Sequence, residues 1–381
     1  MKKPIIWQMN GVMNAGGTES LIMELLRKRP ENVEVVLVVH SSDANAVGVY
    51  DEEIRSLGIP MYYLPSVGSV GFQKYKRAFN DLVVKIGKPD VVHSHMNAVG
   101  GFISAAAKSC GIPCRIVHCH ADIKYYGSRL SVMKSEFLLA LMKIFVNSFA
   151  THYWACSKAA ADRLFYKTKK ATVIPNVIDV EKCFCDIPRK EQERKKLGVT
   201  DDRLVIGGMG RVARIKNYEV ILDALGALVA DGVDAHFYCY GRTADEQYMV
   251  ELKERIHRLG IKDRVHFLGN TTSVADSLAA FDVFVMPSVT EGLGIAALEA
   301  QAVGLPVILS TGVPAETDMG LGTVSRVGPF DVMGWKTAIK SIEKCEVSHK
   351  KIKEAFVKNG FDAKTKCIEI YELYREICEV D

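Results

Sequence analysis

Short runs of valine, isoleucine and aromatic residues alternate along the whole chain with longer segments of helical periodicity. This alternation predicts parallel sheets covered by helices, which is the α/β class. The expected strands are residues 4–10, 33–40, 61–65, 90–95, 114–121, 152–157 and 172–176, followed by a second series over residues 204–210, 235–241, 264–269, 282–288, 306–310 and 323–327. Two doubly wound domains that face each other across a cleft are the simplest architecture, and ligands are expected at the carboxyl ends of the strands.

The connection between the two strand series is charged and poor in strand formers. It spans residues 178–202, and Pro188 and Gly198 lie within it, as expected of a linker followed by a solvated helix. The length of 381 residues also favours two domains, since a single domain has roughly 100 to 200 residues. We predict Rossmann-like domains over residues 1–178 and 179–360, and a C-terminal helix over residues 361–381 that packs back on the first domain.

Several protein classes are excluded by composition. No apolar run reaches the roughly 18 residues of a membrane span, and the N-terminus lacks the apolar region of a secretory signal, so we expect a cytoplasmic protein. Its ten cysteines are then expected to be free thiols. The cluster of Cys110, Cys114, His118, Cys119 and His120 lacks the paired cysteine spacing of a zinc site, so we predict no metal there.

Positive charge is concentrated in the first half of the chain. Residues 1–178 hold 22 Lys and Arg against 13 Asp and Glu, a formal charge of +9, whereas the remainder has 27 against 32, or −5. Two segments of the first half, residues 71–79 and 128–149, mix basic with apolar residues. Both segments predict peripheral contact with anionic lipid at the inner face of the cell membrane, and for residues 128–149 an ordinary core helix is the alternative. We expect no nucleic acid partner.

Residues 290–304, TEGLGIAALEAQAVG, place two glutamates around a glycine turn. The turn should connect a strand to a helix over residues 295–303 that ends at Gly304. Backbone amides at the start of that helix favour oxygen acceptors, while Glu291 and Glu299 offer carboxylates to hydroxyl groups. This combination suits a polyhydroxylated ligand such as a sugar or ribose. The alternative is a glycine turn with two exposed glutamates, and the apolar residues on either side of Glu299 argue against it.

The segment GMGRVARIKN, residues 208–217, directly follows an expected strand. Arg211 and Lys216 are two cations at a strand end, the arrangement that neutralises a diphosphate. Gly208, Gly210 and Ala213 also match the dinucleotide fingerprint, so a dinucleotide-dependent oxidoreductase is an alternative. The basic side chains in the loop and the absence of an acidic residue at the end of the next strand argue against that alternative.

Two features of the first half lie at strand ends. Gly16 and Gly17 precede a helix that we expect Thr18 to cap, which makes a second turn able to accept an anion. His120 ends an expected strand, where an imidazole could donate to a substrate oxygen or leaving group, or could simply be a hydrogen-bonded residue of the rim.

Taken together and in this order, these motifs resemble the retaining glycosyltransferases of family 4, which have the GT-B fold of two facing Rossmann-like domains. The resemblance covers essentially the whole chain. It rests on Gly16-Gly17, PDVVHSH, IVHCH, ACSKAAADRL, VIPNVID, GRVARIK and the two glutamates of residues 291–299. The first domain would then bind the acceptor and the second the nucleotide-sugar donor.

The resemblance implies a role for each candidate residue. Arg211 and Lys216 would hold the donor diphosphate, Glu299 the ribose, and Glu291 the hydroxyls of the donor sugar, while His120 would contact the transferred sugar. The remaining donor-binding residues would be Gly16, Gly17, Gly210, Gly292, Leu293, Gly294 and Ile295.

The family's chemistry implies transfer of a hexose-type sugar with retention, from a UDP-sugar to a hydroxyl of a glycan or lipid-linked acceptor in exopolysaccharide or capsule synthesis. No D-x-D run is placed to chelate a cation, so neither a metal nor another cofactor is expected, and the nucleotide sugar is a substrate. A sugar-nucleotide epimerase or hydrolase of the same fold remains an alternative.

Overall fold

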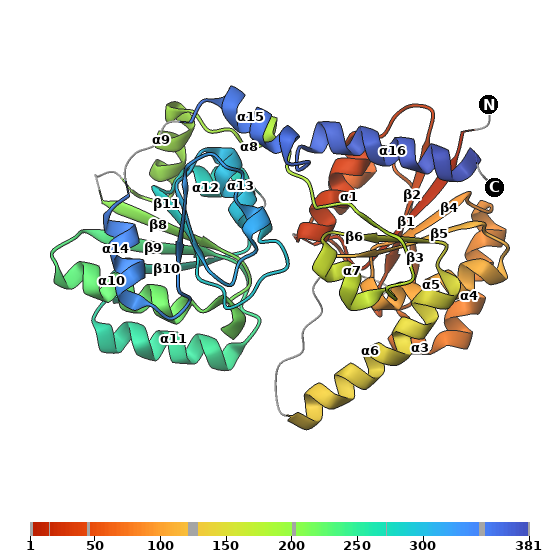
Figure 1. Cartoon of the computed structure of the whole chain (residues 1–381), viewed down its shortest axis with the longest axis horizontal. Helices are drawn as coiled ribbons and strands as arrows, with labels where there is room; N and C mark the ends of the chain where they lie inside the picture. The colour runs from red at the N-terminus through yellow and green to blue at the C-terminus, as the bar shows by residue number, and fades with distance from the viewer. Residues whose placement is uncertain are drawn as a thin grey trace. The chain divides into compact units, whose positions relative to one another are not determined.

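The computed structural model describes residues 3–14, 16–43, 46–120, 129–199, 203–271, 273–342 and 347–379 (Figure 1). Its contacts divide the chain into two units, the first formed by Met1–Val177 with Ala363–Asp381 and the second by Ile178–Asp362. The expected domain boundary lies beside the observed one, and the helix expected at residues 361–381 begins at Ala363 and belongs to the first unit.

The first unit is built on a parallel sheet of seven strands in the order β3-β2-β1-β4-β5-β6-β7. The strands are β1 Ile5–Asn10, β2 Glu34–His40, β3 Met61–Leu64, β4 Val91–Ser94, β5 Cys114–Cys119, β6 His152–Ala155 and β7 Ala171–Val173. β1 pairs with β2 on one side and β4 on the other, so the strand order reverses between β1 and β4. In doubly wound folds such a reversal opens a crevice at the carboxyl ends of the strands.

Helices cover both faces of this sheet. They are α1 Gly17–Arg27, α2 Asp51–Ser56, α3 Val67–Val70, α4 Phe72–Ile86, η1 Asn97–Val99, α5 Gly100–Ser109, α6 Arg129–Phe149, α7 Lys158–Leu164 and α16 Ala363–Glu379. Alternate residues of a strand point to opposite faces, so Ile6 packs in the core under α1 and α16 while Trp7 packs against Phe79 of α4.

The second unit has a parallel sheet of six strands in the order β10-β9-β8-β11-β12-β13. The strands are β8 Leu204–Met209, β9 Ala235–Tyr240, β10 Val265–Gly269, β11 Val283–Met286, β12 Val307–Ser310 and β13 Val324–Val327. The helices are α8 Val180–Cys183, α9 Ile187–Lys196, η2 Arg214–Lys216, α10 Tyr218–Ala230, α11 Glu246–Leu259, η3 Lys262–Arg264, α12 Val274–Ala279, α13 Ile295–Val303, η4 Ala315–Thr317, α14 Val332–Lys340 and α15 His349–Lys358. Here the order reverses between β8 and β11.

Helix α16 is the last element of the chain, and it packs on the first unit. The Tyr371 hydroxyl donates to the Leu25 carbonyl of α1 at 2.7 Å, and Gln8 of β1 donates to the Tyr374 hydroxyl at 3.0 Å. Cys367, Ile370 and Tyr374 are buried in the core shared with α1. The apolar side of this helix is therefore used in packing on the first unit.

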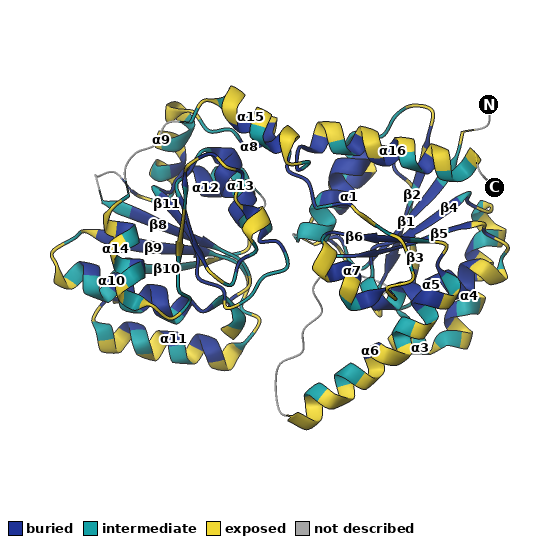
Figure 2. Cartoon of the chain, in the orientation of Figure 1, coloured by how far each residue is buried: buried dark blue, intermediate teal, exposed yellow. Residues whose placement is uncertain are grey.

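The two basic segments differ in how far their apolar side chains are buried. In α4, which contains residues 72–79, Tyr75 and Phe79 are fully buried and belong to the core of the first unit. In α6 much of the apolar surface stays exposed (Figure 2). Within the described parts of the chain, no helix has both the length and the apolar character needed to cross a bilayer.

Candidate active site

The loop after β8 presents Lys216 beside the reversal of strand order in the second unit. Gly210 has a φ of 142°, and a Cβ there would lie 3.2 Å from Lys216 Cε, so glycine leaves room for the lysine stem. Asn217 has a left-handed backbone with a φ of 54°. Its side-chain amide donates to the Pro287 carbonyl at 3.1 Å and the Pro329 carbonyl at 2.6 Å, which ties the turn of Lys216 to the neighbouring strand ends.

Lys216 forms an ion pair with Glu291 across the strand reversal. Lys216 Nζ lies 2.5 Å from Glu291 Oε1, and the Ser288 hydroxyl donates to the same oxygen at 2.6 Å. The side chains of Lys216 and Glu291 are 17% and 15% exposed. A pair in this partly desolvated position keeps a cation and a carboxylate fixed at the carboxyl end of the sheet.

The three basic residues of this loop have different surroundings. Arg214 pairs with Glu251 of α11 at 2.5 Å, and its guanidinium lies over the Tyr248 ring. Arg211 is exposed and has no hydrogen bond or ion pair within the described parts of the chain. Arg214 is therefore held against α11, whereas Lys216 is held by Glu291 at the strand ends and Arg211, on the same loop, is unpaired among the described residues.

Helix α13 starts in the turn that follows Glu291. Gly294 has a φ of 77°, and a Cβ there would lie 3.1 Å from Met286 Sδ, so the turn requires glycine. Leu293 is buried, and its carbonyl accepts a hydrogen bond from the Thr317 hydroxyl. Gly292 and Ile295 are partly exposed, and the first amides of the helix, which include that of Ile295, have no carbonyl four residues earlier within the helix.

Glu299 lies on α13 one turn beyond Ile295. It has no hydrogen-bond or ion-pair partner within the described residues, and burial raises the pKa of its carboxyl to about 8. Removal from water disfavours the charged form of the carboxyl group, so a ligand that donates hydrogen bonds to Glu299 would stabilise that form.

The glycine turn of the first unit differs from its expected form. Gly16 is the N-cap of α1 and Gly17 its first residue, so the expectation that Thr18 caps this helix is wrong. A Cβ at Gly16 would collide with the Glu19 carboxylate, which folds back toward this end of the helix. Burial raises the pKa of Glu19, and Asn10 donates to it at 3.4 Å. An acidic side chain therefore lies beside the turn that we expected to accept an anion.

His120 follows β5 at the carboxyl edge of the first sheet. Its backbone N–H donates to Asn97 Oδ1 at 2.7 Å, and Asn97 has a left-handed backbone with a φ of 48°. The His120 ring lies 2.8 Å from His95 Nδ1 through Nε2 and 3.1 Å from the Asn176 amide through Nδ1. Burial lowers the pKa of His120 to about 4, so the ring is neutral at physiological pH.

A buried chain of hydrogen bonds runs from His118 through His93, Tyr374, Gln8 and His95 to His120. His118 Nε2 must donate to the Ile174 carbonyl, so its Nδ1 accepts from His93, 3.3 Å away. His93 Nδ1 then accepts from Tyr374.

The same chain continues from Tyr374 back to His120. Tyr374 accepts from Gln8, whose amide oxygen accepts from His95 Nε2 at 2.7 Å. His95 Nδ1 therefore accepts from His120 Nε2, and the Asn176 amide must present its nitrogen to the ring. Both ring nitrogens of His120 are occupied inside the first unit, so ring contact with a sugar requires one of these bonds to be exchanged.

Three of these histidines could hold a metal ion. The ring nitrogens of His93, His95 and His118 lie within 4.8 Å of one another, and burial lowers the pKa of all three well below the usual value. Sequence reasoning missed this group because it considered His118 with nearby cysteines. The signal was present as two H-x-H motifs, residues 93–95 and 118–120, at the ends of adjacent parallel strands.

Comparison with known proteins decides the family. Residues 15–182 match the family model described as Glycosyltransferase Family 4, and residues 189–360 match the model described as Glycosyl transferases group 1. EpsF of Bacillus subtilis (strain 168), a protein named as a glycosyltransferase, is 30% identical over 388 residues that cover 100% of this chain and 98% of EpsF. The chain belongs to glycosyltransferase family 4.

Other relatives of this glycosyltransferase agree with the assignment. The capsular polysaccharide biosynthesis glycosyltransferase CapM of Staphylococcus aureus is 26% identical over 365 residues, which cover 89% of this chain and 86% of CapM. Among solved structures, Anabaena Alr3699/HepE in complex with UDP has a TM-score of 0.77 and 20% identity, covering 97% of this chain and 99% of HepE. The fold is GT-B, as predicted. Because the chain belongs to a glycosyltransferase family, the alternative of a dinucleotide-dependent oxidoreductase is set aside.

The candidate residues of the glycosyltransferase fall into two groups. Lys216 and Glu291 are brought into contact in the second unit, which also contains Arg211, Gly210, Glu299 and the turn of residues 292–295. Gly16, Gly17 and His120 belong to the first unit. The assigned roles of these residues stay predictions.

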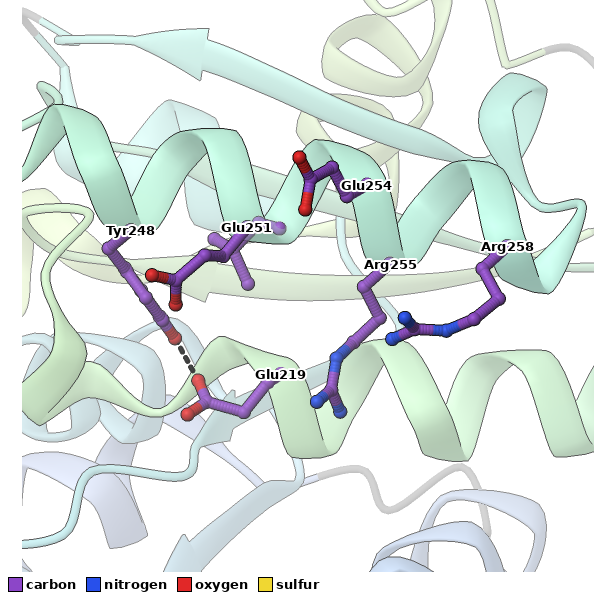
Figure 3. Close-up of a pocket in the computed structure, with 7 residues that line it drawn as sticks. Glu219, Tyr248, Glu251, Glu254, Arg255 and Arg258 are labelled. Carbon is purple, nitrogen blue, oxygen red and sulfur yellow. Dashed lines mark hydrogen bonds between the residues drawn. The ribbon is translucent and has the colours of Figure 1, made fainter.

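A polar hollow of about 240 Å³ lies between α10 and α11 of the glycosyltransferase (Figure 3). It is lined by Glu219, Tyr248, Glu251, Leu252, Glu254, Arg255 and Arg258. Several of these side chains are already paired, since Tyr248 donates to Glu219, Glu251 binds Arg214 and Arg255 binds Asp223. The hollow lies along two helices and not at the carboxyl ends of the strands, so we do not place the active site there.

Proposed function

We propose that this glycosyltransferase moves a hexose-type sugar from a UDP-sugar to a hydroxyl of a glycan or lipid-linked acceptor in cell-surface polysaccharide synthesis. The observation that carries the donor assignment is the Lys216–Glu291 pair at the strand reversal of the second unit, with Arg211 exposed on the same loop. Cations suit a diphosphate, and carboxylates suit sugar hydroxyls. The UDP complex of HepE and the name of CapM support the nucleotide and the polysaccharide.

Transfer depends mainly on stabilising charge. Cleavage of the bond between the anomeric carbon and the diphosphate leaves negative charge on the phosphate oxygens, which Arg211 and Lys216 would neutralise. When phosphate attracts Lys216, Glu291 is released to accept hydrogen bonds from the donor sugar. The amides at the start of α13 would add partial positive charge.

The acceptor oxygen would form the new bond on the face that the diphosphate leaves, so the anomeric configuration is retained. Its proton would pass to a phosphate oxygen of the leaving group, and no metal ion is needed. A lipid-linked acceptor would place the enzyme at the inner face of the cell membrane.

A thermal-shift panel of nucleotide sugars tests the donor. A donor at about 100 times its dissociation constant adds roughly 2.7 kcal/mol of stability, so a UDP-sugar should raise the melting temperature and GDP-sugars should not. Turnover of the best donor is then followed with a chelator present, and the product's anomeric configuration is read by proton NMR. Loss of turnover on chelation or an inverted product would contradict the mechanism.

Incubation of the donor without an acceptor separates the alternative functions. A transferase releases UDP only slowly under these conditions, because water is a poor substitute for the acceptor. Full conversion of the donor to its epimer would instead identify an epimerase, and rapid release of UDP with free sugar would identify a hydrolase.

A further inference from the structure

The buried chain of hydrogen bonds in the first unit has a single direction. It ends at the Ile174 carbonyl, which can only accept, so His118 carries its proton on Nε2. Each further group of the chain then donates to the group before it. The ring proton therefore lies on Nε2, and Nδ1 accepts, in all four histidines of the chain, which are His93, His95, His118 and His120.

Gln8 of β1 sets the direction for the two rings nearest the carboxyl edge of the sheet. Its side chain is fully buried, and its amide nitrogen donates to the Tyr374 hydroxyl at 3.0 Å, which turns the amide oxygen toward His95. That oxygen accepts from His95 Nε2 at 2.7 Å. Since an amide oxygen only accepts, it holds the His95 proton on Nε2 and leaves Nδ1 to accept from His120.

The two hydrogen bonds of the His120 ring differ in what their loss would cost. Exchange of the 2.8 Å bond from Nε2 would leave the buried His95 Nδ1 without its donor. The 3.1 Å bond between Nδ1 and the Asn176 amide is the last of the chain, so its exchange leaves every other bond intact. A ligand is therefore expected at Nδ1, where the ring offers a lone pair and accepts a hydrogen bond.

We propose that Gln8 is a positioning residue for sugar transfer, which acts through His95 to keep His120 an acceptor at Nδ1 for a hydroxyl of the transferred sugar. This inference rests on the proposed function and on the predicted contact of His120 with that sugar. The sequence suggested that the His120 imidazole could donate to a substrate oxygen. Because His95 takes the only ring proton, the structure favours the opposite polarity.

Nitrogen-15 NMR of the full chain labelled at histidine tests the tautomers, because protonated and unprotonated ring nitrogens give separate signals. At pH 7 the parent should show all four buried rings protonated at Nε2. The variant His120→Gln identifies the His120 signals by their loss.

The variant Gln8→Leu breaks the chain at one position. It replaces the amide with an apolar side chain of similar size, so His95 Nε2 loses its acceptor, and an N–H without a partner is unfavourable in the core. The protons of His95 and His120 should both move to Nδ1, where His120 can donate to the Asn176 amide oxygen. His93 and His118, beyond the break, should stay protonated at Nε2.

Turnover connects the tautomer to the reaction. Gln8→Leu should lower turnover of a UDP-sugar on the order of tenfold, because His120 no longer accepts at Nδ1. UDP binding should stay unchanged, since Gln8 lies outside the second unit. The matched control Tyr371→Phe removes another buried hydrogen bond of the first unit, to the Leu25 carbonyl, and should keep both the tautomers and the turnover of the parent. Thermal melting shows whether both variants are folded.

Four results would overturn the proposal. They are a parent with any of the four rings protonated at Nδ1, a metal ion bound to His93, His95 and His118 in the parent, unchanged His120 signals in a folded Gln8→Leu, and moved signals with the turnover of the parent. The first two need no variant, so the proposal can fail even if Gln8→Leu does not fold. Absence of transfer by the parent, with its tautomers as expected, would overturn the proposed function while the coupling of Gln8 to His120 stands.

Discussion

The two units share one scaffold and differ in the chemistry at the carboxyl ends of their strands. In both sheets the strand order reverses beside the first strand of the unit, β1 or β8. At this edge the first unit has neutral histidines and amides joined in a buried chain, whereas the second unit has a lysine, a glutamate and an exposed arginine. The strand order therefore determines where a site lies in each unit, and the residues that follow each strand determine the charge of that site.

This difference has an electrostatic cause. Imidazoles removed from water stay neutral when hydrogen bonds satisfy their nitrogens, so His93, His95 and His118 can be buried. The lysine and the carboxylate of the second unit instead face each other as an ion pair that retains some contact with solvent. The first edge is suited to orienting neutral groups, and the second to holding a charged diphosphate.

Acid should therefore weaken the first unit most. Burial lowers the pKa of His40 and of His120 to about 4. It also lowers the pKa values of His93, His95 and His118. Below pH 6.5 these histidines bind protons in the unfolded chain but not in the folded unit, so the free energy of unfolding of the first unit decreases as the pH falls. Each such histidine contributes up to about 1.4 kcal/mol per pH unit.

Hydrogen exchange measures this effect separately in each unit. Amide protection in β1, β4 and β5 should fall between pH 6.5 and 5 by more than protection in β8 and β11. Equal losses in the two sheets would show that the neutral histidines do not distinguish the units.

Removal of either cation should abolish most transfer activity. Arg211→Ala and Lys216→Ala are each expected to lower turnover on the order of 10²-fold or more, because each removes a charge from the developing diphosphate. Arg214→Ala is the matched control, since Arg214 lies on the same loop but pairs with Glu251. Near-normal turnover in both of the first two variants would remove the basis for the donor site.

Glu299 should make the second unit less stable as the pH rises. Its folded pKa of about 8 exceeds the ordinary value of 4.5, so between these values the unfolded chain releases a proton that the folded unit retains. Glu299→Gln should therefore be more stable than the parent at pH 8, by on the order of 2 kcal/mol, and nearly equal at pH 5. Denaturant unfolding at both pH values checks this, and a gain that does not depend on pH would contradict it.

The smallest expected effect concerns nucleotide affinity. Glu299→Ala should weaken UDP binding by about tenfold, because a carboxyl group that accepts hydrogen bonds from the ribose hydroxyls is lost. The exposed Glu316, on a neighbouring turn, supplies the control Glu316→Ala. Calorimetry gives both affinities, and equal values in the two variants would rule out the ribose role.

Local patterns in the sequence were enough for the elements of the fold. Each expected strand overlaps an observed one, and α13 begins at Ile295 and ends before Gly304 as predicted. These features depend on residues that are close along the chain, such as β-branched runs and a glycine that ends a helix. Arg211, Lys216 and Glu291 could be named for the same reason, since they lie in the loops that follow β8 and β11, and Glu299 lies on the helix after the second of these loops.

Contacts between distant segments were decided only by the tertiary structure. Lys216 meets Glu291, 75 residues away, because β8 and β11 are neighbours, and His120 meets His95 because β5 lies beside β4. The sequence also left open which arginine turns away from the site and whether α6 or α4 buries its apolar residues. Neighbouring residues fix secondary structure, but burial and pairing depend on which elements the whole fold brings together.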